Sequence, residues 1–353
     1  MLNLTFSLLK YFPPELAHYI TLNLLKLKPF FINQKNENNP KLHQNLWGLD
    51  FKNPIGLAAG FDKNAEVISQ LLDLGFGFVE AGTVTPKPQY GNNKPRVFRL
   101  PEDSAIINHL GFNNQGSEVV KKKLEKLNIN FFSKGIVGIN ISKNKDTKNT
   151  IEDYCIALEK LGSLVNYIVI NISSPNTPGI RNLQNKSNFD NLIKTLHKVR
   201  KNNEDLISKP ILIKIAPDID DEQARDLALS SLALGIDGMI ISNSTIDKSS
   251  KLQSRYRNEV GGLSGKPLFI KSTLMLKKMY SLTNGQIPLI GVGGISNGID
   301  CYEKIKAGAS LVQLYTSLMY QGPSLITKIK SDLLNFIVTD GYKNIKEAIG
   351  VDI

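Results

Sequence analysis

The chain has 353 residues, of which 41% are hydrophobic, and its formal net charge is +11 at pH 7. That length suits either two average domains or one large α/β barrel, and the apolar content excludes a collagen-like or broadly disordered chain. The lysines are spread along the whole chain, so we expect no nucleic-acid partner, although the positive charge would also suit an anionic membrane surface.

Neither the cysteines nor the histidines are spaced as metal ligands. Cys155 and Cys301 lie far apart, and the four histidines form no i,i+4 pair. We therefore predict free thiols in a reducing compartment and no bound metal.

Residues 1–39 form a separate N-terminal segment. The short apolar stretch LNLTFSLLKYF is broken at Pro13–Pro14, and a predicted helix follows whose apolar residues share one face: Leu16, Tyr19, Ile20, Leu24 and Leu27. Neither piece reaches the roughly 20 apolar residues needed to cross a bilayer, and neither resembles a secretory signal or an Arg-rich transit peptide. Two interpretations remain, a helical hairpin packed on a barrel or a pair of amphipathic helices in a membrane interface, and the high apolar fraction favours the second.

From residue 40 to 353 we predict a second domain built from alternating strands and helices. Near-continuous apolar runs recur between helical stretches, which is typical of a parallel sheet covered on both faces. The runs occupy 55–60, 76–82, 135–141, 167–172, 211–216, 238–243, 288–294 and 311–316. Eight such units favour a closed (β/α)₈ TIM barrel over an open sheet. The connections 83–134 and 244–286 are long enough to add a subdomain or lid near the barrel mouth.

Polar residues interrupt these apolar strands close to their C-terminal ends. They are Glu80, Asn140, Asn171, Lys214, Asn243 and Gln313. Barrel enzymes assemble their active sites at that end from several strands, so we predict a site there. Lys214 lies among apolar neighbours in ILIKIAP and must pair either with a carboxylate such as Glu80 or with an anionic ligand.

Two glycine-rich or polar turns follow the last two strands. GVGGIS (291–296) follows the seventh strand and YTS (315–317) ends the eighth. Backbone N–H groups at these positions are the usual phosphate site of the fold, so a phosphorylated ligand or cofactor is predicted. The turn at 172–179, ISSPNTPG, leaves Ser174 open to interpretation as an ordinary turn residue or as a catalytic one.

With these motifs in place, the chain resembles the class 2 dihydroorotate dehydrogenases, membrane-associated, quinone-linked flavoenzymes of pyrimidine biosynthesis. The resemblance runs from residue 55 to 316 in family order. The matching stretches are GLAAGFDKN, EAGTVTPKPQ, KPRVFRLPED, INHLGFNNQG, GINISKNKDT, NISSPNTPG, LIKIAPD, GGLSGKPL, IGVGGI and GASLVQLYT. PPELAHY resembles part of the quinone-tunnel hairpin of the same family.

The resemblance implies a role for each matching position. FMN is expected at Ala59, Gly60, Lys63, Thr83, Asn140, Asn171, Lys214, Ser242, Gly265, Gly293, Gly294, Tyr315 and Thr316. Dihydroorotate or orotate is expected at Lys63, Asn108, His109, Leu110, Gly111, Phe112, Asn171, Asn176, Asn243 and Ser244. Ser174 matches the catalytic base, and His18 and Arg99 match the quinone end of the tunnel. The resemblance also implies a peripheral protein on the cytoplasmic face of the inner membrane, which a monomer would satisfy.

Two departures and two alternatives accompany this assignment. His109 replaces an arginine that relatives often have, and SNS at 242–244 replaces TNT or SNT. A tRNA-dihydrouridine synthase would share the FMN barrel, but it would need a cysteine after a barrel strand, where this chain has none. A flavin-free phosphate-binding barrel, such as an aldolase or isomerase, would use the same phosphate turns.

Overall fold

The computed structural model describes residues 9–27, 39–127 and 135–353. Most of the first predicted N-terminal stretch, together with residues 33–38 of the polar linker, lies outside these ranges.

A closed barrel of eight parallel strands forms the centre of the molecule, which confirms the predicted fold class. The strands follow one another around the barrel as β3 (Ile55–Leu57), β4 (Phe78–Val84), β7 (Ile136–Ile141), β8 (Tyr167–Asn171), β9 (Ile211–Ile215), β10 (Gly238–Ile241), β12 (Leu289–Val292) and β13 (Ala309–Leu314). Each strand coincides with one of the predicted apolar runs. Side chains on both faces of these strands are buried, so the strands are apolar along almost their whole length.

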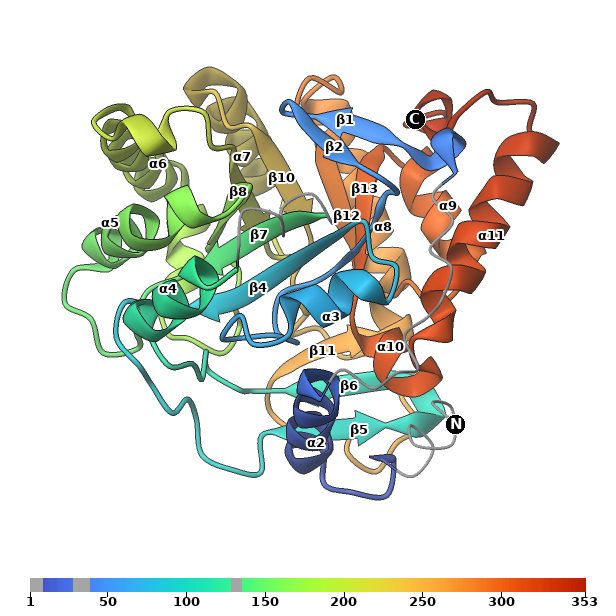
Figure 1. The fold of residues 1–353 in the computed structure, drawn as a ribbon, viewed down its shortest axis with the longest axis horizontal. Coiled ribbons are helices and arrows are strands. Elements are labelled where there is room, and N and C mark those ends of the chain that lie inside the picture. Colours follow the sequence, from blue (N-terminus) through green and yellow to red (C-terminus); the bar gives the residue numbers. More distant parts are fainter. Residues whose placement is uncertain (1–8, 28–38, 128–134) are drawn as a thin grey trace.

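Helices surround the barrel and cover the outward faces of its strands (Figure 1). They are α3 (Ile68–Asp73), α4 (Ser117–Glu125), α5 (Thr150–Leu161), α6 (Lys186–Lys201), α7 (Asp221–Leu234), α8 (Phe269–Leu282), α9 (Gly298–Lys306), α10 (Thr316–Gln321) and α11 (Ser324–Thr339). Side chains fix several starts: Asn149, Asp220 and Asn297 each accept a hydrogen bond from the backbone N–H three residues later. At the other end, α7 stops at Gly235, whose positive φ of 69° suits glycine.

The barrel interior is filled by interdigitated large and small residues. Phe78 and Tyr167 point inward, and a Cβ added to Gly56 or Gly138 would come within 2.3 Å or 2.1 Å of their rings. The hairpin of β1 (Gln44–Leu46) and β2 (Leu49–Phe51) adds Trp47 and Phe51 to the same core. The N-terminal end of the barrel is therefore closed by packed aromatic rings, and space for a ligand is left at the C-terminal end.

A small antiparallel sheet lies outside the barrel, where the long connections predict an added subdomain. It consists of β5 (Val97–Leu100), β6 (Ala105–Asn108) and β11 (Gly262–Gly265), in the order β11-β6-β5. The two first strands come from one long connection and β11 comes from the other. Each connection also contains a helix of the outer ring, α4 or α8, so the inserted part is shorter than the sequence intervals suggest.

Helix α2 (Pro14–Lys26) lies beside β5 and β6, far from the β1–β2 hairpin (Figure 1). The Glu15 carboxylate accepts hydrogen bonds from Arg96 Nε and Nη2 at 3.0 and 2.8 Å, and Lys26 pairs with Glu66. Ala17 and Leu25 are buried, whereas Leu16, Tyr19, Leu24 and Leu27 are exposed. Most of the predicted apolar face therefore points to solvent. Among the described helices, none has the length and apolar character that crossing a bilayer requires.

Candidate active site

A cavity of about 850 Å³ opens at the C-terminal ends of the barrel strands, between them, the small sheet and α2. Most of the residues predicted from the sequence line it. They are His18, Ala59, Gly60, Lys63, Thr83, Asn108, Leu110, Gly111, Phe112, Asn171, Ser174, Asn176, Lys214, Ser242, Asn243, Ser244, Gly265, Gly293, Gly294, Tyr315 and Thr316. Asn140, His109 and Arg99 are absent from this lining.

Lys214 lies on the floor of the cavity, where β9 faces β8 and β10. Its ammonium is 4.0 Å from Glu80 Oε1, and only 5% of the residue is exposed. Burial lowers the pKa of Lys214, and the Glu80 carboxylate partly opposes that effect. Both interpretations from the sequence therefore fit the geometry, since this cation has a carboxylate behind it and open space in front.

The Glu80 carboxylate is held mainly by two amides rather than by Lys214. Asn140 Nδ2 donates to Oε1 at 2.8 Å, and Gln313 Nε2 donates to Oε2 at 2.7 Å. This explains why Asn140 is buried beneath the cavity instead of lining it. The ammonium of Lys214 keeps hydrogen-bonding capacity for a ligand.

Hydrogen bonds join the polar side chains of three neighbouring strands. Thr83 Oγ1 donates to Asn140 Oδ1 at 2.7 Å, and Asn171 Nδ2 donates to the same oxygen at 3.1 Å. Further along, Ser173 Oγ donates to Asn171 Oδ1 at 2.9 Å and accepts from Asn243 Nδ2 at 3.0 Å. Each amide is thus fixed in one orientation before a ligand arrives.

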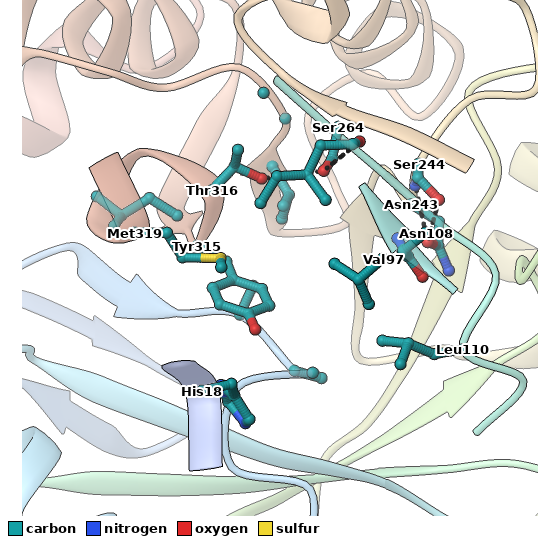
Figure 2. A pocket seen from close by; sticks show the side chains of 18 of the residues that line it. His18, Val97, Asn108, Leu110, Asn243, Ser244, Ser264, Tyr315, Thr316 and Met319 are labelled. Carbon is teal, nitrogen blue, oxygen red and sulfur yellow. Dashed lines mark hydrogen bonds between the residues drawn. The ribbon is translucent and has the colours of Figure 1, made fainter. Parts of the chain in front are cut away.

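Ser174 lies in the turn that follows β8, and 5% of it is exposed. Its Oγ accepts a hydrogen bond from the backbone N–H of Asn176 at 3.2 Å, as an ordinary turn serine would. It also lines the cavity, next to Asn176, whose side chain donates to the Asn108 carbonyl at 3.0 Å. Figure 2 shows Asn108, Asn243 and Ser244 gathered on one side of the cavity and Tyr315 and Thr316 on the other.

Arg181, which the sequence did not single out, ties three strand ends together. Its guanidinium donates to the carbonyl of Ser173 at 3.1 Å, to that of Ser244 at 3.2 Å, and to the carboxylate of Asp218 at 2.9 Å. These three acceptors follow β8, β10 and β9. The turn that carries Ser174 is therefore braced against its neighbours.

A second cation, Lys63, enters the cavity from the turn after β3. Its ammonium donates to the Gly60 carbonyl at 2.9 Å. Burial lowers its pKa to about 8, with Arg96 acting in the same direction and Glu15 opposing it. Below that pH the side chain is charged and can pair with an anionic ligand.

The opposite end of the cavity has the character of an anion site. Gly293 and Gly294 have φ values of +112° and +81°, and a Cβ on Gly294 would come within 2.5 Å of the Phe269 backbone. In the described part of the chain, the N–H groups of these two glycines have no hydrogen-bond partner. Ser317 Oγ is likewise buried and unpaired there, and it lines the cavity. Unpaired donors at one point are what a phosphate group would satisfy.

Unpaired polar atoms also mark other parts of the same lining. Asn113 Oδ1 and Gln313 Oε1 are buried and lack partners among the described residues. Both atoms are acceptors, so a ligand that carries N–H or O–H donors would supply those partners. The residues present therefore fit a phosphorylated ligand that also carries hydrogen-bond donors.

The two residues predicted at the quinone end lie on α2 itself (His18) and on the neighbouring strand β5 (Arg99). His18 lines both the large cavity and a smaller one of about 60 Å³, to which Arg99 also contributes. Burial lowers the pKa of His18 to about 3, and its ring packs edge-on against Phe61 at 5.2 Å. Arg99 donates to the carbonyls of Lys10 and Phe12 at 2.9 and 2.7 Å, so it holds the chain just before α2.

His109 points away from the large cavity. Its Nδ1–H donates to the Val260 carbonyl at 2.8 Å, and its ring lies 5.9 Å from that of Phe98. The side chain therefore lies in the subdomain, outside the cavity lining, while the following residues, Leu110 to Phe112, line the cavity. No group of three or more His, Cys, Asp and Glu side chains that could hold a metal occurs among the residues described.

Comparison with known proteins agrees with the motifs. The dihydroorotate dehydrogenase family profile matches residues 41–337. A protein named dihydroorotate dehydrogenase (quinone) from Xanthobacter autotrophicus is 46% identical over 348 residues, covering 98% of this chain and 97% of its own. Its counterpart from Parvibaculum lavamentivorans is 48% identical and covers 96% and 95%.

A solved structure is similar over the full length. The crystal structure of DHODH from Eimeria tenella in complex with ferulenol superposes with a TM-score of 0.93 at 42% identity, covering 100% of this chain and 99% of that one. The similarity therefore includes the barrel, the small sheet and α2.

The Glu80 carboxylate is predicted to stabilise the fold through Lys214. Glu80→Gln should lower the free energy of unfolding by about 3–5 kcal/mol, because it leaves a buried ammonium without an opposing charge. Urea denaturation without added flavin measures this value. Adding Lys214→Met should recover part of the loss, and a double variant as unstable as the sum of the two single variants would contradict the coupling. Glu118→Gln, at an exposed carboxylate paired with Lys160, is the control and should leave the free energy of unfolding unchanged.

Proposed function

The chain belongs to the dihydroorotate dehydrogenase family, and from this premise we propose that it oxidises dihydroorotate to orotate and passes the electrons to a quinone. This reaction is an oxidation of a CH–CH bond in pyrimidine biosynthesis. One observation carries the proposal: a single cavity has an anion site at one end, a group of oriented amides with Ser174 at the other, and the ammonium of Lys214 in its floor.

We propose FMN as the cofactor. Gly293, Gly294, Thr316 and Ser317 would hold its phosphate, and Gly60, Thr83 and Lys214 would lie against its ring system. A bound FMN would supply the redox chemistry, namely uptake of the hydride from C6 of dihydroorotate and transfer of its electrons to the quinone. The fixed charge of Lys214 suits a ring that becomes more negative on reduction, since a preorganised cation costs no rearrangement during the reaction.

The amides at the other end suit a pyrimidine. Asn108, Asn171, Asn176 and Asn243 each offer donors and an acceptor, which matches a ring of alternating carbonyl and N–H groups. Lys63 would pair with the carboxylate of the substrate. The hydrogen bonds among these side chains hold the substrate ring in one orientation relative to the flavin.

Ser174 is proposed as the base that removes the C5 proton of dihydroorotate. A serine is a weak base at its ordinary pKa, so the proton must leave in a site from which bulk water is excluded, with relay through a neighbour or a water molecule. The burial of Ser174 and the brace from Arg181 support this role. The two cysteines are remote: Cys155 is in α5 and Cys301 in α9, which argues against the tRNA-dihydrouridine synthase alternative.

Helix α2 is proposed to bring the quinone to the flavin and the protein to the membrane. Its exposed apolar side chains would enter the lipid interface, and His18, neutral at physiological pH, would lie along the route to the cavity. This arrangement suits a peripheral protein on the cytoplasmic face of the inner membrane. The basic net charge would add attraction to anionic lipids.

An acceptor panel with dihydroorotate as the donor tests the proposed function. The purified protein should be yellow, with a flavin absorption band, and should reduce a ubiquinone analogue while NAD and fumarate remain unreduced. Reduction of NAD at a comparable rate would contradict the quinone-linked class. A colourless protein that FMN does not reconstitute would favour the flavin-free barrel.

Ser174→Ala should retain the flavin but reduce it slowly. We expect single-turnover flavin reduction by dihydroorotate to slow by about 10²–10⁴, the effect of losing a positioned base. Stopped-flow absorbance of the bound flavin measures the rate. Ser230→Ala removes an equally buried hydroxyl in α7 and should leave the rate unchanged. An unaltered rate in Ser174→Ala would remove this residue from the mechanism.

The double variant Leu24→Gln/Leu27→Gln should bind lipid vesicles at least about tenfold more weakly. Each substitution removes exposed apolar surface that would otherwise be buried in the lipid interface. Co-sedimentation with uncharged phosphatidylcholine vesicles measures the affinity without adding or removing charge. Flavin reduction by dihydroorotate should not change. Leu229→Gln/Leu274→Gln is the matched control, because these leucines are also exposed but lie on α7 and α8. Equal loss of vesicle binding in both double variants would contradict a specific role for α2.

A further inference from the structure

Lys304 is a fully buried lysine outside the cavity lining. It lies in α9, none of its surface is exposed, and it is among the largest fully buried side chains in the described chain. Its ammonium donates to Ser272 Oγ in α8 at 2.6 Å and lies 5.0 Å from the centroid of the Phe269 ring. Burying a cation is costly unless an opposite charge or strong hydrogen bonds offset the loss of water.

The described residues provide no ion pair for this ammonium. The nearest acidic side chains in sequence are Asp300 and Glu303, of which Asp300 accepts hydrogen bonds from the N–H and hydroxyl of Ser296, and Glu303 is exposed. Burial lowers the pKa of Lys304 well below its ordinary value, and these two carboxylates only partly oppose the effect. The ammonium thus lacks a close counter-charge in the protein itself.

A hydrogen-bond chain leads from Lys304 to the glycine loop of the anion site. Because Ser272 Oγ accepts from the ammonium, its own hydrogen is available to a carbonyl, and that of Gly293 lies at 3.0 Å. The carbonyls of Leu268 and Phe269 lie at 2.9 and 3.0 Å and compete for the same hydrogen.

The direction of this contact affects the peptide between Gly293 and Gly294. In a trans peptide the C=O and N–H point in opposite directions. Since the Gly293 carbonyl faces Ser272 and α8, the N–H of Gly294 faces away from them, on the side where both glycines line the cavity. The loop packs closely against the start of α8, since a Cβ on Gly294 would come within 2.5 Å of the Phe269 backbone.

We propose that Lys304 is a positioning residue for the phosphate of the flavin cofactor, acting through Ser272 to fix the Gly293–Gly294 peptide and supplying a buried positive charge behind it. The inference rests on the proposed function, because it requires FMN in this cavity. A phosphate at the loop would provide the missing counter-charge, separated from the ammonium by Ser272 and the Gly293–Gly294 peptide. Lys304 itself touches neither substrate nor cofactor.

The test compares FMN with riboflavin, which has the same ring system but no phosphate. Dissociation constants of both flavins are measured by fluorescence quenching on the full-length protein after its flavin has been removed. For Lys304→Met we expect FMN to bind about 10- to 100-fold more weakly, the effect of losing a charge-assisted hydrogen bond, and riboflavin to bind as before. Lys330→Met, at a buried lysine in α11, is the control and should alter neither constant.

Ser272→Ala provides a second, smaller change to the same chain. We expect Ser272→Ala to weaken the binding of FMN but not that of riboflavin. The double variant should lose less FMN-binding free energy than the sum of the losses in the two single variants. This variant tests the inference even if Lys304→Met fails to fold, which a thermal unfolding scan would detect. An equal loss for both flavins, or an unchanged ratio of their constants in both single variants, would overturn the inference. Failure of the unaltered protein to bind either flavin would instead overturn the proposed function.

Discussion

A buried ammonium beside a buried carboxylate sets the conditions for the rest of the site. Lys214 and Glu80 lie at the floor of the cavity, where the amides of Asn140 and Gln313 donate to the carboxylate and the ammonium faces the open space. Because these groups come from different strands, the barrel must close before the charges are balanced. Folding and assembly of the site therefore depend on the same contacts.

Much of the fold was predictable because the barrel strands are buried on both faces. Such strands must be apolar along their whole length, so each is visible as a short run such as YIVINI or ILIKIA. The small sheet was predictable only as extra length, because β11 pairs with β6 from a distant part of the chain and no local pattern records that pairing. For the same reason the residue ranges of the long connections overstated the subdomain.

The site residues divide along a similar line. Polar residues that break an apolar strand were visible in the sequence, and most of them line the cavity. Arg181 was missed because a polar residue in a turn or short helix is ordinary until tertiary contacts bury it. Lys304 was hidden for the same reason, since a lysine in EKIK is typical of an exposed helix face. The substrate role of His109 rests on the resemblance alone, and its ring contacts the Val260 carbonyl.

The aromatic packing around Trp47, Phe51 and Tyr167 has a consequence for molecular traffic. Because the N-terminal end of the barrel is closed, a ligand must both enter and leave through the C-terminal end. Any breathing movement that admits or releases a molecule then belongs to the small sheet, α2 and the turns, which can shift without breaking the strand ladder. The rigid packing thus lies at the N-terminal end of the barrel, and ligand entry and release take place at its C-terminal end.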